Sequence, residues 1–270
     1  MRTYLGLATL GLYAASLAFY IRYLYVNKRL LGRAATACLL AGVALHYAAL
    51  LARSRWVHAV PYQDLYGSMS LFAWLLAFIY LVLETYHRQR AVGPFVLPFV
   101  IVLFAVAHFV PSVPPPAAPA RGTEFALHVT LNILAYAGFA LSFVLSLIYL
   151  LQDRLLRGRK LGPVFWRYPA LEVLERMSRS SVVIGMASLA VGIVFGFIWA
   201  HRIQGRYWNG DAKEITTLAV FALYSGYLWL GRKTAWRGAR ASWLCALNFL
   251  LVVFSYTVVN LYLSRYHRYF

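Results

Sequence analysis

Long apolar runs, separated by short polar connections, make up most of the chain. The runs cover residues 4–26, 34–52, 67–86, 91–110, 125–151, 181–200, 215–231 and 241–263. About 20 apolar residues in an α-helix, rising about 1.5 Å each, span a hydrocarbon core of about 30 Å. The first run is too long for a signal-peptide core and lacks a strongly basic leader, so we count it as a span. The pattern therefore predicts an all-α integral membrane protein with eight transmembrane helices, folded as a single polytopic domain over residues 1–270.

One polar connection, residues 152–180, is both basic and patterned. It begins with arginines and continues as "PALEVLERMSRSS", in which Leu171, Leu174 and Met177 recur at helical spacing with charges between them. This pattern is typical of a short amphipathic helix that lies in the membrane interface. We therefore predict a basic loop with a short interfacial helix between the fifth and sixth spans.

A second polar connection, residues 201–214, concentrates acidic side chains. The stretch "HRIQGRYWNGDAKEI" holds Asp211 and Glu214, two of only 8 acidic residues in the chain. Asp211 is suited to cap a helix that begins near Ile215, and Glu214 would then lie beside the positive end of the helix dipole. Capping is one explanation for the two carboxylates, and a functional loop is the other.

Composition supports the membrane assignment, and the distribution of charge predicts an orientation. The chain is 62% hydrophobic and only 13% charged, against about 25% charged in soluble domains. The formal net charge of +18 could suggest nucleic acid, but the connections after the first, third, fifth and seventh spans hold 16 of the 26 Lys and Arg residues. The positive-inside rule then places both termini and the 201–214 loop on the outer side. We expect the partner to be a lipid bilayer and not nucleic acid.

Cysteines and glycines within the predicted spans indicate what chemistry and what packing to expect. Cys38 and Cys245 both fall inside predicted spans and no CxxC motif is present, so thiol–disulfide chemistry and covalent haem attachment to this chain are not expected. Gly192 and Gly196 stand in a small-xxx-small arrangement in the sixth span. This spacing allows another helix, or a flat ligand, to approach the backbone closely.

Histidines gather in the outer half of the predicted topology. Six of the seven lie there: His46, His58, His108, His128, His201 and His267. Two neutral imidazoles can bind the iron of a haem from opposite faces, and Arg202 and Arg206 could pair with its propionates. A zinc site is the rival, but HxxxH and HExxH spacings are absent. His46, about six residues below the outer end of its span, is either a second haem ligand or a hydrogen-bonded packing residue.

Several segments together resemble the CcsA/HemX cytochrome c assembly family, which is related to CcmC. "PYQDLYGSMSLFAW" (61–74) is similar to the family's P-x-x-N-x-Y-E-S segment, and "PALEVLERMSRSSVVIG" to its connection into the next span. "LHVTLNILAY" (127–136) and "VVNLYLSRYHRY" (258–269) resemble the segments that carry its two outer-face haem histidines. Between them, "QGRYWNGDAKE" (204–214) is similar to the tryptophan-rich WWD motif, W-G-x-Y-W-N-W-D-P-K-E. The resemblance covers nearly the whole chain in order.

The resemblance implies a haem site. In that family the WWD segment forms a platform for haem over the outer membrane face, and the two flanking histidines are its axial ligands. Carried across position by position, this implies haem b bound by His128 and His267. The implied motif residues are Gly205, Tyr207, Trp208, Asn209, Asp211, Lys213 and Glu214, with Arg206 among them in the loop. It also implies residence in the bacterial cytoplasmic (inner) membrane, with a CcsB-like membrane partner and an apocytochrome c.

The motif also departs from the family pattern. Gln204, Gly210 and Ala212 stand where the family has Trp, Trp and Pro, and Trp229 stands where many full synthetases carry an inner histidine. The leading interpretation is haem handling or presentation in cytochrome c biogenesis, within a holocytochrome c synthetase (haem lyase) complex if the protein is catalytic. One alternative is a non-catalytic haem-binding subunit, either for control of haem synthesis or within a larger membrane electron-transfer complex. The other is an accessory subunit that kept the fold and lost haem.

Overall fold

The computed structural model describes residues 2–57, 65–109, 122–159 and 167–263. Within these residues, eight α-helices coincide with the eight predicted apolar runs. They are α1 (Arg2–Val26), α2 (Arg29–Val57), α3 (Leu65–His87), α4 (Gly93–Phe109), α5 (Gly122–Arg157), α6 (Leu171–Gln204), α7 (Ala212–Leu230) and α8 (Ala239–Phe254). A 3₁₀ turn (Thr234–Trp236) precedes α8, and a π-helical segment (Ser255–Leu263) continues it.

Six of the described helices, α1, α2, α3, α5, α6 and α8, are long and apolar enough to cross a membrane. Helix α4 is apolar but has only 17 residues, and α7, with 19 residues, does not belong to that group. The all-α class is therefore confirmed, and six helices have the length and composition that membrane spans require. The number of eight spans and the side of the membrane that each end faces remain predictions.

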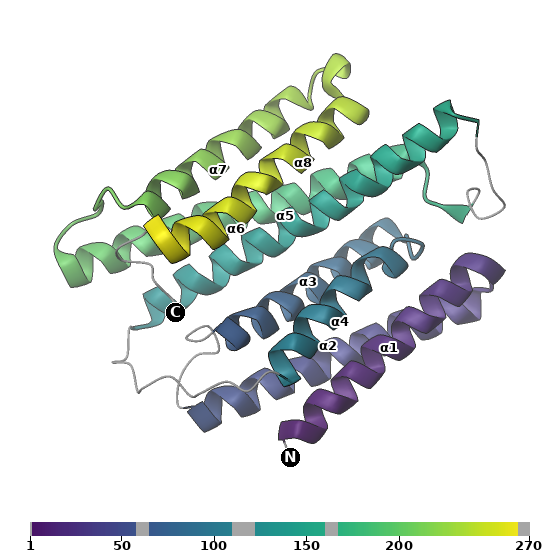
Figure 1. Ribbon diagram of the computed structural model, residues 1–270, viewed down its shortest axis with the longest axis horizontal. Helices are drawn as coiled ribbons and strands as arrows, with labels where there is room; N and C mark the ends of the chain where they lie inside the picture. Colours follow the sequence, from purple (N-terminus) through teal and green to yellow (C-terminus); the bar gives the residue numbers. More distant parts are fainter. Residues whose placement is uncertain (1, 58–64, 110–121, 160–166, 264–270) are drawn as a thin grey trace.

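The helices form two groups that follow the order of the chain, α1 to α4 and α5 to α8 (Figure 1). The groups meet where α3 packs against α5 and α6, and where α4 touches α5. Consecutive helices run in alternate directions, so the loop between α6 and α7 lies at the same end as the start of α1 and the end of α8 (Figure 1). We call this the loop end of the molecule.

Buried polar groups in α1 to α4 are joined to one another. Near the end opposite the loop end, the Glu84 carboxylate accepts hydrogen bonds from the Tyr20 hydroxyl and from Thr36 Oγ1, the latter at 2.5 Å. The guanidinium of Arg90 supplies the counter-charge, with Nε 3.7 Å from Glu84 Oε1. A buried charge is stable only when it is paired and hydrogen-bonded, and Glu84 meets both conditions.

The basic connection 152–180 differs from its prediction. Residues 171–180 do not form a separate interfacial helix but are the first turns of α6, which continues without a break to Gln204. Leu174 and Met177 are fully buried in the protein core, so their helical spacing reflects packing and not contact with lipid headgroups. No proline interrupts the chain between Leu171 and Gln204, so the hydrogen-bond ladder has no reason to end there.

Candidate functional site

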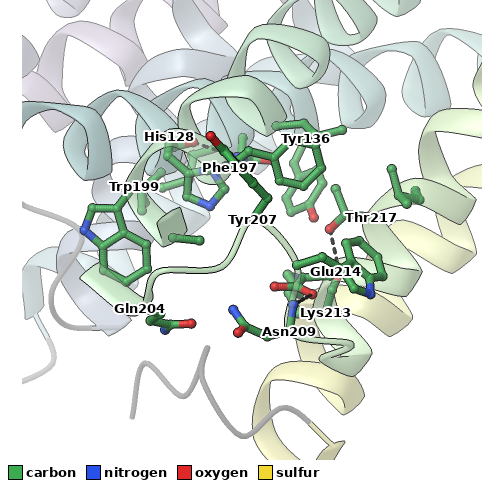
Figure 2. Close-up of a pocket in the computed structure, with 18 of the residues that line it drawn as sticks. His128, Tyr136, Phe197, Trp199, Gln204, Tyr207, Asn209, Lys213, Glu214 and Thr217 are labelled. Carbon is green, nitrogen blue, oxygen red and sulfur yellow. Dashed lines mark hydrogen bonds between the residues drawn. The ribbon is translucent and has the colours of Figure 1, made fainter. Parts of the chain in front are cut away.

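A cavity at the loop end brings together α5, α6, α7, the 205–211 loop and the π-helical segment. With its open mouth included, the space between its walls is about 1100 Å³. Its aromatic walls are Tyr136, Phe197, Trp199, Tyr207, Trp208 and Tyr256. Figure 2 shows His128 and Trp199 on one side of the cavity, and Lys213, Glu214 and Thr217 on the other. A flat apolar ligand would find aromatic faces and a few polar groups here.

His128 reaches this cavity because α5 and α6 approach each other closely. A Cβ added to Gly196 would lie 2.6 Å from His128 Nδ1, and one added to Gly192 would lie 2.9 Å from the Asn132 amide nitrogen. The two glycines therefore make room for side chains of α5, as their small-xxx-small spacing predicts. Gly196 in particular is the surface against which the imidazole of His128 lies.

The hydrogen bonds of His128 define its tautomer. Nδ1 lies 2.7 Å from the carbonyl oxygen of Gly192. Nδ1 also lies 3.2 Å from the amide nitrogen of Asn132, which can only donate. The contact with the carbonyl oxygen, which can only accept, is the shorter of the two and favours a proton on Nδ1. Metal-ligating histidines typically donate their second N–H to a carboxylate or a backbone carbonyl, which fixes the ring and raises its basicity. Gly192 thus gives His128 the support that a metal ligand needs.

The WWD-like loop is shaped by two left-handed glycines. Gly205 ends α6 with φ 68°, and its N–H donates to the carbonyl of His201 at 2.9 Å. Gly210, which replaces the last tryptophan of the motif, has φ 70°. A residue with a Cβ is strained in this backbone region, so the glycine matches the local turn. Tyr207 stacks on His201, with ring centroids 4.1 Å apart.

The two acidic residues of the loop form a capping box. Glu214 Oε2 accepts the backbone N–H of Asp211 at 3.3 Å, and the Asp211 side chain accepts the backbone N–H of Glu214 in return. Glu214 Oε2 also accepts the N–H of Asn209 at 3.0 Å. Helix α7 accordingly begins at Ala212, three residues earlier than predicted. Reciprocal bonds of this kind satisfy backbone donors at a helix start, so capping accounts for both carboxylates.

Most of the predicted site residues lie together. The cavity is lined by His128, Tyr207, Trp208, Asn209, Lys213 and Glu214, together with Gln204 at the first motif position. Gly205, Arg206 and Asp211 belong to the same loop but are not lining residues. His267 lies outside the described residues, so its place relative to the cavity remains a prediction.

His46 lies elsewhere, buried among α1 to α4. Its Nδ1 is 3.1 Å from the Tyr13 hydroxyl and its Nε2 is 3.0 Å from Ser70 Oγ. Both ring nitrogens therefore have hydrogen-bond partners from neighbouring helices. Of the two interpretations of His46, this geometry favours the packing residue over a second haem ligand.

The arginines expected to pair with propionates are placed differently from the expectation. Arg202 Nη1 donates to Glu124 Oε1 at 2.7 Å, so its charge is already neutralised at the surface. Arg206 is exposed on the loop and, like Arg202, is not a lining residue. Lys213 is the only Lys or Arg among the described residues that line the cavity. As for the zinc alternative, no group of three or more His, Cys, Asp or Glu gathers anywhere in the described chain.

Several lining residues were missed from the sequence. Asn132 and Tyr136 follow His128 at i+4 and i+8, so helical spacing from the histidine could have found them. Tyr256 reaches the cavity from the π-helical segment, and Ser68 reaches it from α3. Local spacing carries no signal for these two, because they come from elements distant in sequence.

Comparison with known proteins identifies the family. A family model described as "Cytochrome C assembly protein" matches residues 62–267, which include the cavity and its loop. The chain belongs to the cytochrome c assembly protein family. "Protein HemX" of Brevibacillus brevis is 29% identical, and the match covers 92% of each chain. The "Cytochrome c biogenesis protein CcsA" of Pyropia yezoensis is 27% identical over 96% of this chain and 94% of that protein.

A solved structure shares the fold. The "Cytochrome c Heme Lyase CcmF" has a TM-score of 0.68 to this chain at 18% sequence identity, and the alignment covers 98% of this chain. The chain spans about half, 47%, of the length of that structure. The likeness therefore shows that the fold of the described residues is found within a larger protein. The protein is a membrane member of the CcsA/HemX group of cytochrome c assembly proteins.

Proposed function

We propose that this protein binds haem b in the cavity at the loop end, through His128 and His267, and handles haem in cytochrome c biogenesis. The observation that carries the proposal is the contact between His128 Nδ1 and the Gly192 carbonyl at 2.7 Å. It holds the ring in the tautomer whose Nε2 can bind iron. The aromatic walls of the cavity suit a flat apolar macrocycle.

The roles of the side chains follow from their positions. His128 would provide one axial nitrogen from α5, and His267 would provide the other from the chain that follows the π-helical segment. Trp208 and Tyr207 would cover the mouth of the cavity, while the Asp211–Glu214 capping box holds the loop at the start of α7. Bound haem would supply the vinyl groups that form thioether bonds with apocytochrome cysteines, and the protein would supply position.

The proposal includes a setting for the protein. The basic connections face the cytoplasm, both termini and the loop end face outward, and the membrane is the bacterial cytoplasmic membrane. A CcsB-like membrane protein and an apocytochrome c are the expected partners. The family membership and the curated relatives named for cytochrome c biogenesis support this setting.

Absorption spectroscopy of the purified protein tests the haem site. Expressed with native haem supply and solubilised in mild detergent, the protein should show a Soret band with bis-histidine character. His128→Ala and His267→Ala should each weaken or shift the band, and added imidazole should restore it by filling the vacated axial position. His87→Ala is the matched control, because His87 ends α3, its Nε2 lies 3.1 Å from Ser180 Oγ, and it is not a lining residue. A wild-type protein without a Soret band, even after reconstitution with haem, would refute the proposal.

A non-catalytic haem-binding role is the second candidate. It is favoured by the loss of two motif tryptophans, at Gln204 and Gly210, and the left-handed backbone at Gly210 is adapted to that loss. Such a subunit would bind haem for control of haem synthesis or within a larger electron-transfer complex. Deletion of the gene separates the two roles. Loss of holocytochrome c indicates assembly, whereas normal holocytochrome c with altered haem synthesis indicates regulation.

A further inference from the structure

Lys213 is a buried cation at the wall of the cavity. It is the second residue of α7, its exposed fraction is 9%, and Figure 2 shows it beside Asn209 and Glu214 at the foot of the loop. Its Nζ donates to the carbonyl oxygen of Ser255 at 3.1 Å and lies 3.3 Å from Ser255 Oγ. Nζ also lies 5.4 Å from the centroid of the Tyr136 ring, another wall of the cavity.

The contacts of Lys213 are neutral. No carboxylate of the described residues lies within ion-pair distance of its Nζ. The adjacent carboxylate, that of Glu214, accepts the backbone N–H groups of Asn209 and Asp211. Lys213 thus differs from Glu84, Arg202 and Arg90, which all have an opposite charge nearby.

The surroundings of Lys213 make this arrangement costly. An ammonium withdrawn from water loses hydration that only an opposite charge fully replaces. The first turn of α7 is the positive end of a helix dipole, where a cation is disfavoured. The carbonyl of Ser255, where the π-helical segment continues α8, offsets part of the cost as a hydrogen-bond acceptor. Lys213 and Glu214 both line the cavity, and the Glu214 carboxylate is engaged by backbone N–H groups. An anionic group in the cavity would supply Lys213 with the opposite charge that it lacks.

We propose that Lys213 is the residue that binds a carboxylate group of the cavity ligand. The inference rests on the proposed haem site and names the propionate side chains of haem as the groups that Lys213 recognises. The sequence suggested that Arg202 and Arg206 pair with the propionates. Because neither arginine lines the cavity, we assign this role to Lys213. An ammonium offers three donors, so one N–H can donate to the carboxylate while the others still donate to Ser255.

Comparison of haem with its dimethyl ester tests the inference. The ester keeps the macrocycle and the iron but lacks the two negative charges. Titrations of the purified, haem-free, full-length protein in detergent would give the dissociation constants of both ligands. Wild type should bind haem about ten- to a hundredfold more tightly than the ester, as expected for one charge-assisted hydrogen bond. In Lys213→Met, which keeps the aliphatic stem, the ratio of the two dissociation constants should be close to one. Lys213→Arg keeps the charge, so most of the difference between haem and the ester should remain.

Two further variants separate recognition from packing. Ser255→Ala removes the Oγ partner but keeps the charge, so the ratio should persist. Arg206→Met removes an exposed cation of the same loop that is not a lining residue, and the ratio should again persist.

Two outcomes would overturn the inference while leaving the proposed haem site intact. One is a wild-type protein that binds haem and its dimethyl ester with equal affinity. This measurement does not depend on whether any variant folds. The other is a Lys213→Met protein that loses affinity for both ligands to the same extent. In that case Lys213 would only hold α7 against Ser255 and would not recognise the carboxylate. A wild-type protein that binds neither ligand would instead refute the proposed function, and the inference would fall with it.

Discussion

His46 and His128 lie in different halves of the molecule and show how one residue type takes two roles. His46 is fully buried, and both its ring nitrogens are hydrogen-bonded, to Tyr13 and Ser70. His128 is half-buried beside an open cavity, and a backbone carbonyl holds its Nδ1. The apolar runs that carry the two histidines look alike in sequence. The difference is the space beside the ring, which only the packing of other helices creates.

The buried charges repeat this contrast. In α1 to α4, Glu84 has two hydroxyl donors and the guanidinium of Arg90. In α5 to α8, Lys213 has only neutral partners and faces the cavity. A charge enclosed by a hydrogen-bonded network helps to order a fold, whereas a charge that lines a cavity can meet a ligand. The cation at the cavity therefore lies in the second half, and the first half contributes Ser68 to the lining.

Filling the space at His128 should give the largest effect. In Gly196→Ala the new Cβ would lie 2.6 Å from Nδ1, so the ring must move and its bond to Gly192 must break. We expect haem affinity to fall, and the free energy of unfolding to drop by about 3 kcal/mol, the upper part of the usual range for overpacking. Haem titration of the purified variant measures this loss.

Gly226→Ala is the matched control for this substitution. It lies in α7, and nothing lies within 4 Å of the position of its new Cβ. Its haem affinity should equal that of wild type, and its helix should be slightly more stable because alanine favours helix over glycine. Equal haem affinity in Gly196→Ala and wild type would mean that the orientation of His128 does not matter for binding.

His46→Ala should have an intermediate effect, and on stability alone. The substitution leaves the hydroxyls of Tyr13 and Ser70 without their partner and opens a void beside Phe104. We expect the free energy of unfolding to drop by about 2 kcal/mol, which a thermal melt in detergent would measure. The Soret band should keep its position and its intensity per folded protein. A shifted Soret band would indicate that His46 is a haem ligand, and the two histidines would then not differ in role.

Asp211→Ala should have the smallest effect. It removes one half of the capping box at the start of α7, at a cost of about 1 kcal/mol in the free energy of unfolding. Because Asp211 is not a lining residue, the haem spectrum should change little. Chemical unfolding in mild detergent, followed with a haem titration, measures both quantities. Complete loss of haem binding in this variant, with the fold retained, would show that Asp211 acts on the ligand and not only as a cap.

The helices could be predicted from sequence because hydrophobicity is a local property. All eight apolar runs became helices, with bounds that differ mainly where polar flanks extend the helix, as at Leu171 and Ala212. The same locality explains the error at 171–180. Helical spacing of Leu174 and Met177 shows that one face is apolar, but it does not show whether lipid or protein covers that face.

The candidate site was only partly predictable. Resemblance singled out His128 and five motif residues that line one cavity, and their role in binding haem stays a prediction. It did not show that the two loop arginines are not lining residues, or that Tyr256 and Ser68 complete the walls. These facts depend on distances between elements far apart in the chain, which no local pattern encodes.

The sequence alone determined that this is an all-α membrane protein of the cytochrome c assembly family, because composition, apolar run length and ordered motifs are all linear properties. Tertiary structure alone decided which polar side chains are enclosed by neighbouring helices and which line a cavity. His46 and Glu84 are surrounded by partners from neighbouring helices, while His128 and Lys213 share one cavity. The physical reason is that desolvation and hydrogen-bond satisfaction depend on the atoms that surround a group in space.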